Sequence, residues 1–79
     1  MRILDEISDK SLSNVTLYLT FLEASELRDS LEEILKKPLN NHTHVSSENF
    51  QKEITVCIYD TNNLVGFNQR SIDLIINDK

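Results

Sequence analysis

The chain has 79 residues, 39% of them hydrophobic, and a formal net charge of −5. Its length suits one domain, residues 1–79, and its composition is too apolar for disorder. A single cysteine, Cys57, excludes a disulfide within the chain and fits a reducing compartment. Negative charge argues against nucleic acid or an anionic membrane as a partner. We therefore expect one cytoplasmic domain with no signal peptide and no membrane span.

The start of the chain predicts a β-hairpin. Residues 1–7 alternate in part between apolar and polar, and residues 8–11 have turn chemistry. Residues 15–20 alternate more clearly, since Val15, Leu17 and Leu19 point one way and the residues between them the other. The two alternating segments predict the two strands of the hairpin.

A long amphipathic helix is predicted over residues 21–37. Thr20 and Glu23 have the spacing of a capping box, in which each side chain bonds the other's backbone N–H. Pro38 is expected to stop the helix. An apolar stripe at helical spacing predicts the buried face, with Leu31 at its centre. The stripe consists of Ala24, Leu27, Leu31, Ile34 and Leu35.

The second half of the chain predicts one more strand and an ambiguous tail. Residues 39–51 read as a polar connection, and residues 53–59 alternate with many β-branched side chains, as a strand does. In the tail, Ile72, Leu74 and Ile76 alternate like a strand. A helical stripe with Asn68 as N-cap fits the same residues, and we favour the helix.

Two histidines are the candidate metal ligands. His42 and His44 would share one face if they lie on a strand, and Glu48 or Glu53 could add a carboxylate. Zinc is the metal that fits such ligands, and no other cofactor is expected. The alternative is a pair of exposed histidines with no ligand.

One face of the predicted sheet is the candidate interface. If the helix covers the apolar face, the opposite face carries a semi-apolar set with two tyrosines, a residue type enriched at interfaces. The set comprises Thr16, Tyr18, Thr55, Cys57 and Tyr59. The alternative is an ordinary solvated face of an antiparallel sheet.

The sequence thus predicts a small two-layer α/β domain of the α+β type. It has an N-terminal β-hairpin, one long amphipathic helix, a third strand, and a C-terminal helix or strand. The function we expect is non-enzymatic protein interaction, through a homodimer or one protein partner. Metal binding or sensing by His42 and His44 is the alternative. A small enzyme that uses Tyr, His and Cys57 is a third reading, and Gly66 alone cannot build a Gly-rich phosphate loop.

Overall fold

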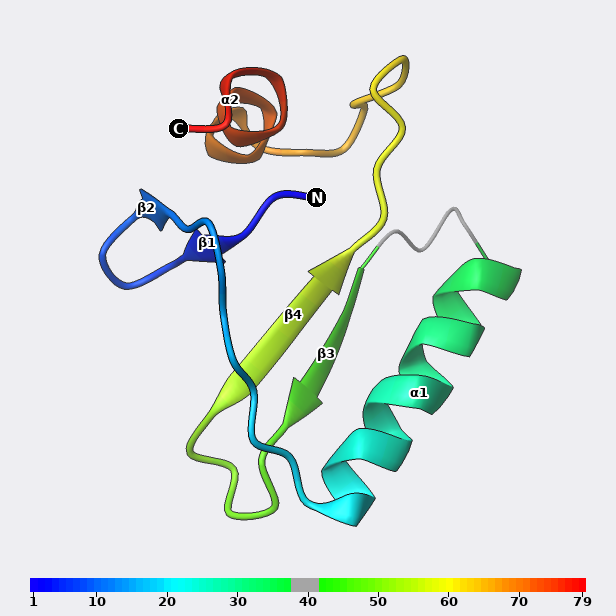
Figure 1. Cartoon of the computed structure of the whole chain (residues 1–79). Helices are drawn as coiled ribbons and strands as arrows, with labels where there is room; N and C mark the ends of the chain where they lie inside the picture. Colours follow the sequence, from blue (N-terminus) through cyan, green and yellow to red (C-terminus); the bar gives the residue numbers. More distant parts are fainter. Residues whose placement is uncertain (38–41) are drawn as a thin grey trace. The chain divides into compact units, whose positions relative to one another are not determined.

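The computed structural model describes residues 1–37 and 42–79. Two antiparallel β-hairpins and two helices give a small α+β fold, which confirms the predicted fold class (Figure 1). The elements in chain order are β1 (Leu4–Asp5), β2 (Lys10–Ser11), α1 (Phe21–Lys36), β3 (His42–Ser46), β4 (Glu53–Cys57) and α2 (Gln69–Asn77).

The chain divides into two compact units. Unit 1 comprises Met1–Leu17 and Asp60–Lys79, and therefore holds β1, β2 and α2. Unit 2 is the continuous segment Tyr18–Tyr59, with α1, β3 and β4. That all 79 residues form one domain stays a prediction.

Helix α1 starts with the predicted capping box. The Glu23 backbone N–H donates to Thr20 Oγ1 at 3.2 Å, and the Thr20 N–H donates to Glu23 Oε1 at 2.9 Å. At the other end, the N–H of the C-cap residue Lys37 donates to the Glu33 carbonyl at 3.1 Å. The helix therefore ends one residue before the predicted boundary. The predicted stop at Pro38 lies outside the described residues.

Strands β3 and β4 form an antiparallel hairpin that supplies the second layer of unit 2. Thr43 pairs with Val56, and Val45 with Ile54. These four side chains are buried or half-buried, whereas the residues that alternate with them are mostly exposed. Helix α1 packs against β3. The hairpin thus has an inner face toward the helix and an outer face that carries polar residues.

The prediction of a polar connection over residues 39–51 is wrong for residues 42–46, which form β3. Val45 is the only strongly apolar side chain in the strand, and the other four are polar. An antiparallel strand with one solvated face tolerates such a composition, because its register is fixed by the partner strand. The partner is β4, which begins at the predicted residue and ends two residues early.

The N-terminal hairpin is confirmed, but its second strand lies earlier than predicted. Leu4 pairs with Ser11 and Asp5 with Lys10, so β2 falls in the segment predicted as a turn. Residues 15–20 form no strand, and that prediction is wrong. Alternation of apolar and polar residues predicts which side chains of an extended segment face the protein. A strand also needs a neighbouring segment that forms backbone hydrogen bonds with it, and the alternation does not supply one.

The ambiguous tail is a helix, as favoured. The Asn68 side chain accepts from the Ser71 N–H at 2.8 Å, which confirms the predicted N-cap. Leu74 and Ile75 are buried in unit 1. Among the described residues, no helix combines the length and the apolar character needed to cross a membrane.

An arginine from the start of the chain completes the C-terminal end of α2. The Arg2 guanidinium donates to the carbonyl oxygens of Leu74 and Ile75, at 3.1 Å and 3.0 Å, and lies 3.6 Å from the Asp78 carboxylate. The last carbonyls of a helix lack partners inside the helix, and a cation also complements the negative end of the helix dipole. Arg2 therefore stabilises α2 from 72 residues away.

The buried face of α1 is centred on Ile34 and not on Leu31. Ile34 is 3% exposed, Leu31 is 36% exposed, and Leu35 and Ala24 are exposed as well. The hairpin is only two strands wide, so α1 buries a narrower stripe than its apolar pattern predicts.

We expect Ile34→Ala to lower the free energy of unfolding by about 2–5 kcal/mol, because it leaves a cavity in the small core of unit 2, where Ile34 and Val45 are both buried. Leu31→Ala should cost clearly less, and Leu35→Ala should be close to neutral. Urea denaturation followed by far-UV circular dichroism gives the three values. A larger loss for Leu31→Ala than for Ile34→Ala would contradict the observed face.

Candidate functional site

The outer face of the β3–β4 hairpin brings together the two histidines and the single cysteine of the chain. We use "outer face" for His42, His44, Glu53, Thr55 and Cys57, all of which are exposed. The register places His42 opposite Cys57 and His44 opposite Thr55. The predicted metal ligands and two of the predicted interface residues therefore share one surface, because side chains two apart on a strand point to the same side.

His44 is held by two neighbours from β4. Its Nδ1 lies 2.7 Å from Glu53 Oε1 and 2.9 Å from Thr55 Oγ1. The rings of His42 and His44 are in an edge arrangement, with centroids 5.4 Å apart. A carboxylate beside one ring nitrogen orients the imidazole. In metal sites, a hydrogen-bond partner on the nitrogen that does not bind the metal has the same effect.

The ligand set for a metal is incomplete among the residues that the structure describes. In the parts described, residues 1–37 and 42–79, no group of three or more His, Cys, Asp or Glu side chains could hold a metal ion. Of the two predicted carboxylates, Glu53 contacts His44, whereas the Glu48 backbone N–H bonds to Glu23 in unit 2. An ion bound at the two histidines would need further ligands from water or from another molecule.

A second surface is formed where α1 begins. The carboxylate of Glu23 accepts from the Thr20 N–H through Oε1, and from the Glu48 N–H through Oε2 at 2.8 Å. Glu48 belongs to the loop between β3 and β4, so one side chain joins the start of the helix to the tip of the hairpin. These bonds to the charged form lower the pKa of Glu23, with the Thr20 N–H the largest cause.

The hairpin loop is held in one conformation by its own polar groups. Ser47 Oγ accepts from the backbone N–H groups of Gln51 and Lys52, and the Phe50 N–H donates to the Ser47 carbonyl at 2.9 Å. Phe50 has a φ of 58°, in the left-handed region. That conformation is rare for a bulky side chain, and it persists only where surrounding bonds determine it.

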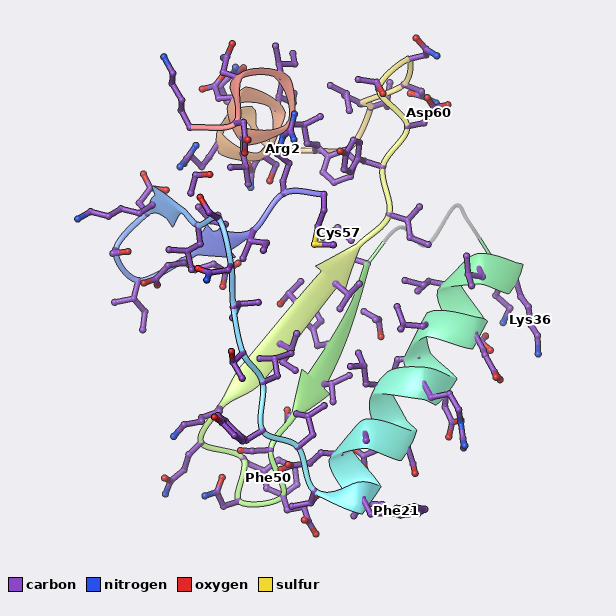
Figure 2. The ribbon with its side chains drawn as sticks, viewed as in Figure 1. Arg2, Phe21, Lys36, Phe50, Cys57 and Asp60 are labelled. Atoms are coloured by element: carbon purple, nitrogen blue, oxygen red, sulfur yellow. The ribbon has the colours of Figure 1, made fainter. Side chains whose placement is uncertain are left out.

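Three aromatic side chains are exposed in these segments. Tyr18 is 93% exposed, Phe21 is 91% exposed and Phe50 is 85% exposed. Phe21 and Phe50 lie at the same end of unit 2 (Figure 2). We call Tyr18, Phe21 and Phe50 the aromatic end. Because Glu23 links the loop to the helix, these side chains project from backbone segments that are held by hydrogen bonds.

The remaining predicted interface residues are not on the sheet. Thr16 and Tyr18 lie in the irregular segment before α1, and Tyr59 follows the last residue of β4 by two positions. The predicted set thus divides between the outer face, with Thr55 and Cys57, and the aromatic end, with Tyr18. Whether any of these residues forms an interface stays a prediction.

Sequence reasoning missed Phe21 and Phe50. Phe21 is the first residue of α1 and lies off the predicted apolar stripe. Phe50 is an isolated aromatic residue within a polar stretch. Neither position can contribute to a regular apolar face, so each was a candidate for exposure before the structure was known.

Comparison with protein-family models, curated proteins and solved structures finds no match to this chain. The functional argument therefore depends on the geometry of the described residues.

The link made by Glu23 predicts a pH-dependent stability. Its folded pKa is lowered, so its contribution is fully present above its ordinary value of 4.5 and is lost as the pH falls through the folded pKa. Glu23→Gln should destabilise the chain at neutral pH, because an amide offers one acceptor oxygen where the carboxylate offers two. The difference between parent and variant should shrink below pH 4.5.

Thermal melts of both proteins across the acid range measure that difference. Glu26→Gln, in an exposed position on the same helix, is the matched control and should leave the melting temperature nearly unchanged. A constant difference between parent and Glu23→Gln at every pH would show that the carboxylate charge is not what stabilises the link.

Proposed function

We propose that this chain is a non-enzymatic protein-interaction domain that binds one protein partner through its aromatic end. The observation that carries the proposal is the near-complete exposure of Tyr18, Phe21 and Phe50. Aromatic side chains dominate the binding energy of many protein interfaces, and they do so from central positions that become fully desolvated. Exposed apolar side chains that gather on one surface, unlike singly scattered ones, mark interaction sites.

The hydrogen bonds that hold the backbone of the aromatic end support the same proposal. A flexible surface must be ordered on binding, and that ordering costs free energy for each side chain that is immobilised. Here the Glu23 link, the Ser47 bonds and the capping box order the backbone in advance. Burial of each exposed phenylalanine can then contribute about 1.5–3 kcal/mol to binding.

Charge near the aromatic end indicates the chemistry of the partner. Glu48 lies two residues before Phe50, with Lys52 the nearby cation in sequence. In the described part of the chain, the Glu48 side chain is in no ion pair. We therefore propose a partner with an apolar cleft edged by basic side chains. The negative net charge disfavours nucleic acid and anionic membranes, and the single cysteine supports a cytoplasmic setting.

The test removes the aromatic groups and measures binding. The full chain, immobilised, is compared with Phe21→Ser and Phe50→Ser variants in affinity capture from the source cells, with quantitative mass spectrometry. We expect a protein that the parent retains and that both variants lose. With that protein purified, each variant should raise the dissociation constant at least about tenfold, a change of about 1.4 kcal/mol.

Matched controls come from unit 1. Ile7 is 99% exposed and Val65 is 86% exposed, so Ile7→Ser and Val65→Ser remove equally accessible apolar groups from elsewhere. Both controls should retain the partner with unchanged affinity. Equal loss in the controls would indicate nonspecific hydrophobic capture, and full retention by the aromatic variants would refute the proposed surface.

A second candidate function is metal binding at His42 and His44. The observation that favours it is their placement on one exposed face, with Glu53 beside His44. Imidazole nitrogen suits zinc, and water or another molecule would complete the coordination. Such a site would be a sensor or a bridge between molecules and not a buried structural centre.

Zinc titrated into chelator-treated protein should raise the melting temperature, because a ligand that binds the folded state stabilises it. The double variant His42→Ala, His44→Ala should show no such rise. Identical melting of the parent with and without zinc would remove this candidate.

A further inference from the structure

The edge of β4 away from β3 presents an ordered set of backbone groups. In the β3–β4 hairpin, the Ser47 N–H donates to the Lys52 carbonyl at 2.8 Å, and these residues are opposite each other in the register. Bonded and non-bonded pairs alternate along an antiparallel ladder. Ile54 and Val56 therefore direct their N–H and C=O groups to β3. Glu53 and Thr55 direct theirs to the opposite edge, where the described residues offer them no backbone partner.

The apolar side chains of β4 are also incompletely covered. Val45 on β3 is 4% exposed, whereas Ile54 and Val56 on β4 are only half-buried. Within unit 2, α1 packs against β3, and β4 lies on the side of β3 away from the helix (Figure 1). The inner face of unit 2 thus continues past the helix to an edge that can be extended.

We infer that a second copy of this chain pairs antiparallel along the β4 edge, with Thr55 at the two-fold axis. The product is a four-stranded sheet in the order β3-β4-β4-β3, with both α1 helices on one face. A two-stranded sheet is marginal alone, and addition of strands at an open edge is a common means of association. The inference concerns the β4 edge and does not depend on the aromatic end.

The sequence of β4 fits itself in this register. Thr55 exchanges two backbone hydrogen bonds with the same residue of the second copy, because its N–H and C=O point to the shared edge. On the inner face, Ile54 meets Val56 of the second copy in a close non-bonded pair, and together they extend the apolar layer. Thr55 is the middle residue of β4, so this register gives the two strands their longest overlap, and a shift along the edge shortens it.

Repulsion between the Glu53 carboxylates of the two copies favours the same register. With Thr55 at the axis, Glu53 lies beside Cys57 of the second copy and about 14 Å from the other Glu53. That separation exceeds the screening length of about 8 Å at physiological salt, so the like charges interact weakly. A pairing centred on Glu53 would instead put two carboxylates opposite each other, which is destabilising.

The principal test is sedimentation of the full chain across the micromolar range, with three proteins. The parent should sediment at twice its 9.1 kDa mass. Thr55→Pro should sediment as a monomer, because proline removes the edge-directed N–H that β3 does not use. Thr55→Val is the matched control: it also removes the hydroxyl bonded to His44 but retains the N–H, and it should dimerise like the parent.

Crosslinking tests the register without a proline in the strand. In a Cys57→Ser background, Thr55→Cys should form a disulfide-linked dimer on mild oxidation, because paired Cα atoms about 5.5 Å apart lie within disulfide range. Glu53→Cys in the same background should not, since its two copies are about 14 Å apart.

Two results would overturn the inference. One is a parent that stays monomeric across the range. The other is a Thr55→Pro variant that is folded by circular dichroism and dimerises like Thr55→Val, which would mean that the copies meet elsewhere. Stronger crosslinking by Glu53→Cys than by Thr55→Cys would replace the proposed register. Partner capture at the aromatic end is independent of this dimer, because Phe21→Ser and Phe50→Ser leave the β4 edge unchanged.

Discussion

The carboxylate of Glu23 is the group on which unit 2 depends. It is the one charged side chain that is buried in the described part of the chain, and its two oxygens accept from two backbone N–H groups in separate elements. A helix and a two-stranded hairpin share little apolar surface, so burial alone constrains their relative position weakly. A polar bond between the first turn of α1 and the hairpin tip adds a directional constraint at one end, while Ile34 and Val45 are the buried apolar side chains in the described part of unit 2.

That constraint also explains why the aromatic end can be exposed and still ordered. An apolar side chain is normally held in place by packing against other side chains, and Phe50 is 85% exposed to solvent. Its position is set instead by backbone bonds to Ser47 and by the attachment of Glu48 to the helix. Polar interactions thus stabilise the backbone that displays an apolar surface, which separates the stability of the fold from the binding role that we propose.

Local chemistry in the sequence predicted local structure well. The Thr20 and Glu23 pair gave the start of α1, and Asn68 gave the start of α2, because a cap needs only neighbouring residues. The errors concerned pairing between segments. Val45 is a single apolar residue among polar ones, so β3 had no period of its own, and its identity as a strand depends on β4. Residues 15–20 had the period but lack a partner.

The same division holds for the site. The spacing of His42 and His44 predicted a shared face only on condition that they lie on a strand, and the sequence analysis did not predict the strand β3 that meets this condition. Their proximity to Cys57 and Thr55 depends on the register of the hairpin, which the sequence does not state. Phe21 is the first residue of α1 and is 91% exposed, which its apolar side chain does not predict.

The contact of Arg2 with the end of α2 has a consequence for biosynthesis. Unit 1 is made of two segments separated by the whole of unit 2, and its arginine cap joins positions 72 residues apart. A ribosome delivers the chain from the N-terminus, and domains generally fold as units while synthesis continues. Unit 2 is continuous, so all of its residues are present once Tyr59 has emerged. The first seventeen residues belong to unit 1. The α2 carbonyl groups that Arg2 binds are present only after α2 has been translated.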